Sequence, residues 1–107
     1  NNGMNFRSAV AVKPGKIDRS PTGTALSAKM AILQRRGKMK AGETLTATSI
    51  IGSQFSGQIL GKTKVGSFDA ILPEISGRAW ITGTHQYMLD PADPWPGGYR
   101  ISDTWGV

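Results

Sequence analysis

The sequence has no cysteine, a single histidine and only seven acidic residues among 107 positions. Without Cys there is no disulfide, no thiolate metal ligand and no thiol nucleophile within these residues. One His and scattered carboxylates also argue against a first-row metal site. We therefore expect no metal, and any thiol chemistry would have to come from outside this chain.

Long apolar runs are missing as well. No stretch of the sequence is long and apolar enough to span a membrane. The first residues, NNGMNFRS, do not resemble a signal peptide. The default expectation is a cytoplasmic protein with no membrane partner.

Aromatic residues make up only 7% of the chain and apolar residues 38%, so the core must be small. The length suits one domain or a piece of one. The net charge of +6 raises the question of nucleic acid. The densest basic run, residues 35–40, follows a predicted helix, where cations suit the helix dipole, and no aromatic RNA-binding signature accompanies it. We expect no nucleic-acid partner.

Residues 16–36, KIDRSPTGTALSAKMAILQRR, are the most informative stretch. A Ser-Pro-Thr-Gly-Thr turn leads into the one convincing helix, whose apolar face carries Leu26, Met30 and Leu33. Thr22 or Thr24 is the expected N-cap, and Gly37 is the expected residue just past the C-terminal end. The low polarity of the first three turns predicts a helix enclosed on most sides.

A helix that starts in such a turn presents unpaired N–H groups and the positive end of its dipole. This end of the helix is therefore a candidate site for an anion, either a phosphate or a carboxylate. On the residues alone, Asp18 is equally well explained as a loop carboxylate that pairs with Arg19 or caps the turn.

The rest of the chain favours short strands separated by Gly and Pro. Candidate strands are residues 5–12, 43–51, 54–60, 67–72, 78–82 and 85–89. One helix with a run of strands predicts an α+β fold with an antiparallel sheet or roll. Residues 90–107 are rich in Pro and Gly and predict an irregular tail. Its Trp95, Tyr99 and Trp105 are expected to pin the tail to a surface that these residues do not contain.

The heptapeptide DRSPTGT at residues 18–24 resembles the motif of the proline racemase family, Asp-Arg-Ser-Pro-Cys-Gly-Thr. The blocks SIIGSQF (49–55) and PEISGRAWITG (73–83) are similar to two further blocks of the family. The end of the chain, from LDP to GGYR, resembles the family's C-terminal end. The resemblance runs from about Ala9 to Arg100.

The resemblance implies a diaminopimelate epimerase-like fold, with strands curled around one central buried helix. It also implies that residues 1–107 are the C-terminal part of a two-domain enzyme whose N-terminal portion, with the family's other catalytic Cys, is missing. Such enzymes need no cofactor and bind an imino acid, proline or hydroxyproline, between two halves. A homodimer is an assembly that this interpretation leaves open.

Two positions depart from the family pattern. The motif Cys is Thr22, and Val12 stands where an aromatic residue often lines the pocket. A racemase or epimerase uses two thiols, one to remove the α-proton and one to return a proton from the other face. An aliphatic hydroxyl is too weak an acid for that role, but elimination of water needs no proton return. Within the family, Thr at this position implies a trans-3-hydroxy-L-proline dehydratase, which forms Δ1-pyrroline-2-carboxylate.

Carried over residue by residue, the motif implies that Asp18 contacts the ring nitrogen of the substrate. Gly23 and Thr24 would give N–H groups to its carboxylate. Thr22, the catalytic candidate, would orient the substrate or assist departure of the hydroxyl. His85 is interpreted as structural or exposed, and Ser53 and Glu74 are explained by turn chemistry.

Three alternatives remain beside this hydro-lyase. The first is an isomerase, a proline racemase or hydroxyproline 2-epimerase, that has lost half of its acid–base pair. The second is a non-catalytic protein that keeps the imino-acid pocket. The third is a basic module that binds phosphate at the same helix end. The fragment alone is expected to be inactive.

Overall fold

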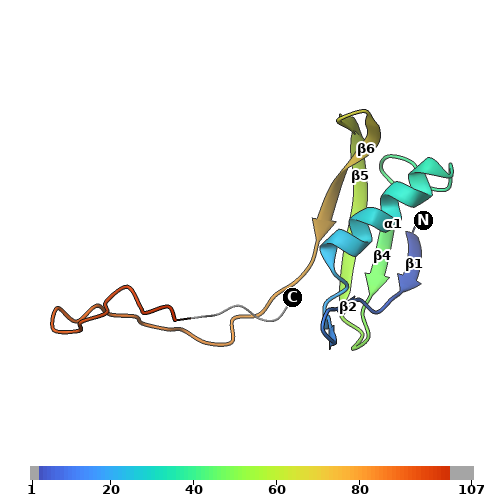
Figure 1. Ribbon diagram of the computed structural model, residues 1–107. Coiled ribbons are helices and arrows are strands. Elements are labelled where there is room, and N and C mark those ends of the chain that lie inside the picture. The colour runs from blue at the N-terminus through green and yellow to red at the C-terminus, as the bar shows by residue number, and fades with distance from the viewer. Residues whose placement is uncertain (1–2, 102–107) are drawn as a thin grey trace.

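The structure is a computed structural model, and it describes residues 3–101. Its architecture is α+β, with one helix and two sheets (Figure 1). The elements in chain order are β1 (Gly3–Arg7), β2 (Ala11–Val12), β3 (Lys16–Ile17), α1 (Gly23–Arg35), β4 (Thr44–Thr48), β5 (Gln54–Val65) and β6 (Phe68–Ser76). No helix in this part of the chain has the length and apolar character needed to cross a membrane.

The main sheet is mixed, which differs from the antiparallel sheet that the sequence predicts. Its strand order is β1-β4-β5-β6; β1 pairs with β4 in parallel, and the other neighbours are antiparallel. Parallel neighbours need a long crossover connection, and α1 lies in the segment that joins β1 to β4. The chain thus contains one β-α-β unit, formed by β1, α1 and β4, which the pattern of short strands in the sequence does not predict.

The core lies between α1 and one face of this sheet. Its fully buried members are Leu26, Met30, Met39, Leu45, Ala47 and Ile59. Along β4 the burial alternates, with Leu45 and Ala47 buried and the threonines between them half-buried, as expected for a strand that packs on one face. The predicted apolar face of the helix is confirmed at Leu26 and Met30, with Leu33 partly buried beside them.

The outer side of α1 is open in this structure. Ala28, Lys29 and Ile32 are exposed, and Ile32 keeps 47% of its surface accessible. The prediction of a helix enclosed on most sides is therefore not met within residues 3–101, because the sheet covers only one side of it. Figure 1 shows the helix lying across one face of the strands.

The C-terminal end of α1 follows the sequence prediction closely. Gly37 has a positive φ of 70°, and its N–H bonds the carbonyl of Gln34 at 3.0 Å, while the N–H of Lys38 bonds that of Leu33 at 2.8 Å. This pair of bonds is the Schellman arrangement, which satisfies the last carbonyls of the helix. The end places Arg35 and Arg36 in water.

The chain beyond Ser76 leaves the folded body as an extended arm (residues 77–101), drawn in orange to red in Figure 1. Every residue of the arm is exposed. The predicted strands at 78–82 and 85–89 are not strands here, because neither segment lies beside another strand. Residues 90–101 form no helix or strand, and Trp95 and Tyr99 meet edge to face. Trp105, which is also expected to pin the tail, lies outside the described residues.

Candidate functional site

Asp18 organises the loop that leads into α1. Its Oδ1 accepts hydrogen bonds from the backbone N–H of Ser20 at 2.9 Å and from the Ser20 hydroxyl at 3.1 Å. Its Oδ2 accepts one from the hydroxyl of Thr22. The N–H of Thr22 in turn donates to the Ser20 hydroxyl at 3.1 Å. The carboxylate thus caps the turn, as one of the two sequence-based interpretations holds, and the structure shows no ion pair between Asp18 and Arg19.

These bonds keep the Asp18 carboxyl ionised. The hydrogen bond from the Thr22 hydroxyl, followed by the bond from the Ser20 backbone, lowers its pKa below the ordinary value of 3.8, although desolvation acts in the opposite direction. Near neutral pH the loop that precedes α1 therefore carries a negative charge at Asp18. Such a charge suits a cationic group of a ligand.

Thr22 occupies the N-cap position of α1, but it does not cap the helix with its side chain. The prediction of a capping hydroxyl at this residue is wrong, because the hydroxyl donates to Asp18 instead. The backbone of Thr22 has a φ of 66° and a ψ of 107°. A β-branched residue seldom adopts a positive φ, so this conformation is strained.

The first turn of α1 is open to a ligand. The first intrahelical bond runs from the Leu26 N–H to the Thr22 carbonyl at 3.0 Å, so the N–H groups of Gly23, Thr24 and Ala25 have no acceptor within the helix. A Cβ built on Gly23 would have no heavy atom within 4 Å. The helix end that the sequence predicts as an anion site is therefore accessible.

A pair of serines fixes the loop to the sheet, and this contact was missed in the sequence. The Ser53 hydroxyl donates to the Arg19 carbonyl at 2.9 Å and shares a 2.6 Å hydrogen bond with the hydroxyl of Ser49, which is fully buried. Ser53 was explained as a turn residue, and it does also lie in the turn between β4 and β5. Its bond to a residue 34 positions earlier is a tertiary contact that no local pattern signals.

A hollow of about 420 Å³ lies beside the motif loop. Ser20 and Ser53 line one part, and Phe55, Arg78 and Trp80 line the remainder. The Arg78 guanidinium lies 5.4 Å from the centre of the Trp80 ring. Residues from the loop, the sheet and the start of the arm thus meet next to the open helix end.

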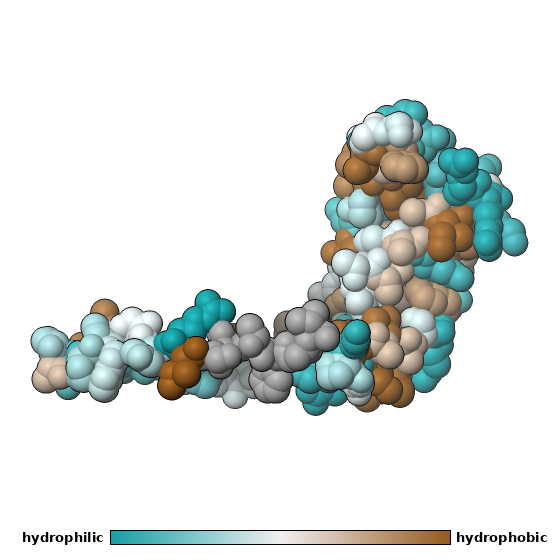
Figure 2. Space-filling model, in the orientation of Figure 1, coloured by the Kyte–Doolittle hydropathy of each residue, from teal (hydrophilic) through white to brown (hydrophobic). Residues whose placement is uncertain are grey.

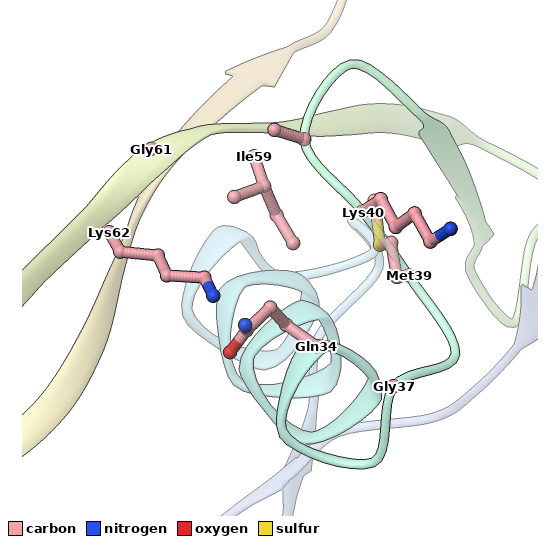
Figure 3. A pocket seen from close by; sticks show the side chains of 8 residues that line it. Gln34, Gly37, Met39, Lys40, Ile59, Gly61 and Lys62 are labelled. Carbon is pink, nitrogen blue, oxygen red and sulfur yellow. The ribbon is translucent and has the colours of Figure 1, made fainter.

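A second hollow, of about 410 Å³, lies at the opposite end of α1 (Figure 3). Gln34 and Lys62 point into the same space there, next to the buried Ile59. It is remote from Asp18 along the helix and holds no acid–base pair, so we do not connect it with the motif. Within residues 3–101 no group of three or more His, Asp or Glu side chains could hold a metal ion.

Taken together, Asp18, Thr22, Gly23 and Thr24 lie around one helix end. This end offers a carboxylate for a cation, N–H donors for an anion, and one hydroxyl between them. Such an arrangement suits a zwitterion such as an amino or imino acid. His85 lies exposed on the arm, stacked with Tyr87, as the sequence interpretation expects.

The chain is similar to two solved structures. A hydroxyproline epimerase from Agrobacterium vitis, solved with bound trans-4-OH-L-proline, is 44% identical and superposes with a TM-score of 0.71. A probable proline racemase from Agrobacterium radiobacter K84, solved with bound carbonate, is 42% identical with the same TM-score. Each match covers 94% of this chain but only 29% and 30% of those chains. The family model for proline racemase matches residues 1–100, and the chain belongs to the proline racemase family.

Proposed function

We propose that this chain is the C-terminal part of a cofactor-independent trans-3-hydroxy-L-proline dehydratase. The observation that carries the proposal is the hydroxyl of Thr22 at the position where the family motif has a thiol. The chain spans about 30% of the related structures, so the enzyme needs a further portion to complete the pocket. We expect a thiolate base in that N-terminal portion and no turnover by the 107 residues alone.

Substrate binding follows from the charges at the helix end. The ionised carboxyl of Asp18 is suited to the ring ammonium of the imino acid. The free N–H groups of Gly23 and Thr24 are suited to the substrate carboxylate. These donors would also stabilise the negative charge that develops when the α-proton is removed.

The proposed reaction is an elimination. A base in the other half takes the α-proton, the electron pair forms a double bond between the α- and β-carbons, and the 3-hydroxyl leaves and is released as water after protonation. The enamine then tautomerises to the cyclic imine, Δ1-pyrroline-2-carboxylate. The Thr22 hydroxyl contributes hydrogen bonding that orients the substrate or assists the leaving hydroxyl. In the free protein it donates to Asp18, so its oxygen remains able to accept a hydrogen bond.

An isomerase is the second candidate, and the solved relatives favour it. The Agrobacterium vitis protein is a hydroxyproline epimerase and was solved with trans-4-OH-L-proline. Epimerisation requires a proton donor on each face of the α-carbon. Thr22 does not supply one, because a hydroxyl has no accessible acidity near neutral pH. A non-catalytic protein that binds the imino acid is compatible with the same geometry.

The complete enzyme is expected to have the diaminopimelate epimerase-like arrangement, with further strands over the exposed side of α1. Ala28 and Ile32 would then be buried, which explains their apolar character. A cytoplasmic homodimer is part of the same proposal.

The test uses the enzyme assembled from this chain and its complementary portion. It is given trans-3-hydroxy-L-proline, and the imine is detected as its adduct with o-aminobenzaldehyde. Thr22→Val should lose activity, whereas Thr63→Ala, an exposed threonine of β5, should retain it. If no adduct forms and the α-carbon of proline exchanges its proton for deuterium, the dehydratase proposal is wrong and an isomerase is favoured.

A further inference from the structure

The positive charge of the folded body is concentrated at the end of α1 that lies away from the motif, where Figure 2 shows hydrophilic residues on the surface. This surface, the basic end, consists of six exposed cations: Arg35, Arg36, Lys38, Lys40, Lys62 and Lys64. Residues 34–43 and 61–70 also hold two acidic residues, which leaves a net charge of +4 out of the chain's +6. The dipole of α1 accounts for cations that follow the helix, whereas Lys62 and Lys64 belong to β5. The fold therefore gathers more positive charge here than the helix end alone requires.

Two of these cations share one carboxylate. Nζ of Lys64 lies 2.8 Å from Oδ1 of Asp69, and Nη1 of Arg35 lies 3.7 Å from Oδ2. Lys62 differs from them, because among residues 3–101 its ammonium has no hydrogen-bond or ion-pair partner. The same holds for the side-chain amide of Gln34 within this part of the chain. Both groups are therefore available to a ligand.

These two available groups meet at a pair of hollows. Figure 3 shows the side chains of Gln34 and Lys62 pointing into the hollow of about 410 Å³, whose base is closed by Met39 and Ile59, each 1% exposed. An adjoining hollow of about 280 Å³ is also lined by Gln34 and Lys62, and it adds Arg35. No acidic residue lines the larger hollow. Its volume lies within the range of about 300–1,000 Å³ that is typical of small-molecule sites.

The partial negative charge at the C-terminal end of the helix does not reverse the field in this hollow. That charge amounts to about half an elementary charge, against a net charge of +4 from the surrounding side chains. The last carbonyls are also occupied, since those of Ile32, Leu33 and Gln34 accept hydrogen bonds from main-chain N–H groups that follow them. An anion that enters the hollow therefore meets cations and N–H donors.

We propose that the hollow at the C-terminal end of α1 binds a small phosphate monoester. A phosphate group carries nearly two negative charges near neutral pH and three acceptor oxygens, which suit the Lys62 ammonium, the Gln34 amide and the Arg35 guanidinium together. The organic part of the ligand lies in the larger hollow, against Ala41 and the aliphatic stem of Lys40. A closed-based hollow favours a small molecule over a nucleic acid, which tracks an extended basic groove. The site contains none of the motif residues, so it does not rest on the proposed function.

The test titrates the 107-residue chain with phenyl phosphate, uses benzyl alcohol as a neutral ligand of similar size, and follows the backbone amides by ¹H–¹⁵N NMR. Phenyl phosphate should give saturable shifts at Gly37, Ala41 and Lys62, and benzyl alcohol should give none. Lys62→Gln should raise the Kd at least about tenfold, because it removes a charge-assisted hydrogen bond. Lys64→Gln is the matched control: it removes the same charge from the same strand, but from a lysine paired with Asp69, and should change the Kd by less than about threefold.

Four results would overturn the proposal. The first is the absence of saturable shifts, and the second is equal binding of benzyl alcohol. The third is equal weakening by both lysine substitutions, which would indicate non-specific attraction to the basic end. The fourth is a set of shifts confined to Gly23 and Thr24, which would place the phosphate at the opposite end of the helix. None of these measurements requires turnover, so their outcome does not depend on the dehydratase proposal.

Discussion

Gly57→Ala tests how closely the sheet approaches the helix that carries the site. Gly57 lies in β5 and is buried. A Cβ at this position would lie 2.8 Å from both Cε and Sδ of Met30 and 3.2 Å from Cδ2 of Leu26. Ordinary contacts between such atoms are about 3.5–4.0 Å, so the new methyl group overlaps Met30 by roughly 1 Å. Both neighbours are fully buried, so the end of the Met30 side chain has to shift within the core to admit the methyl group.

The expected cost is a net loss of stability. Overpacking of a tight core costs about 1–3 kcal/mol. Replacing a strand glycine by Ala returns about 0.5–1 kcal/mol through the reduced entropy of the unfolded chain. The free energy of unfolding should therefore fall by about 1–2 kcal/mol. With a urea m-value of about 1–2 kcal/mol/M, the midpoint should fall by roughly 1 M.

Two matched variants test whether overpacking against Met30 causes the loss of stability. Gly61→Ala, on the same strand, places its Cβ 3.8 Å from Leu72, an ordinary contact, and should leave the midpoint nearly unchanged. In a Met30→Leu background, the side chain lacks the ε-carbon, and Gly57→Ala should cost less than about 0.5 kcal/mol. An undiminished cost in that background, or a stabilised single variant, would refute the packing argument.

Three further predictions concern the motif loop. Ser53→Ala removes the hydrogen bond to the Arg19 carbonyl and leaves the buried Ser49 hydroxyl without its 2.6 Å partner. The free energy of unfolding, measured by urea titration, should therefore fall by about 1–2 kcal/mol, and an unchanged midpoint would contradict this. The pKa of the Asp18 carboxyl, measured by ¹³C NMR, should lie below 3.8 in the folded protein. Because the folded state lowers this pKa, the ionised carboxyl stabilises the fold above pH 3.8, and that stabilisation is lost as the pH falls through the folded pKa. Asp18→Asn should abolish this pH dependence of stability, and a measured pKa at or above 3.8 would count against the prediction. In the assembled enzyme, Thr22→Cys should raise α-deuterium exchange of proline or hydroxyproline, measured by ¹H NMR, by about 100-fold or more; no gain would mean that position 22 does not face the α-carbon.

The helix was predictable because its signals are local. The apolar spacing of Leu26, Met30 and Leu33 and the glycine at position 37 are enough to place its face and its end. Turn chemistry likewise anticipates that Asp18 caps a loop. These features depend on residues within a few positions of one another, and local propensity and hydrogen bonding decide them.

The errors arise where distant segments decide the structure. The sequence pattern ends a candidate strand at residue 60, but β5 continues to Val65. The strand accommodates Gly61 at an irregularity in the β5–β6 register between Ile59 and Gly61. The parallel pairing of β1 with β4 depends on a crossover of more than 30 residues. The bond from Ser53 to Arg19 is equally non-local. The composition of residues 78–89 predicts strands, but a strand needs a neighbouring strand to pair with, and these residues have none among residues 3–101.

The conformation of Thr22 depends both on its neighbours in the sequence and on its place in the folded loop. Its φ of 66° is unfavourable for a β-branched side chain, and a glycine would adopt it freely. The loop nevertheless holds a threonine there, with its N–H bonded to the Ser20 hydroxyl and its own hydroxyl bonded to Asp18. Strain of this kind persists where the surrounding bonds over-determine it, and it concentrates at functional positions. A residue kept in a costly conformation, at an open helix end and beside an ionised carboxyl, supports the proposal that the hydroxyl itself is needed for the chemistry.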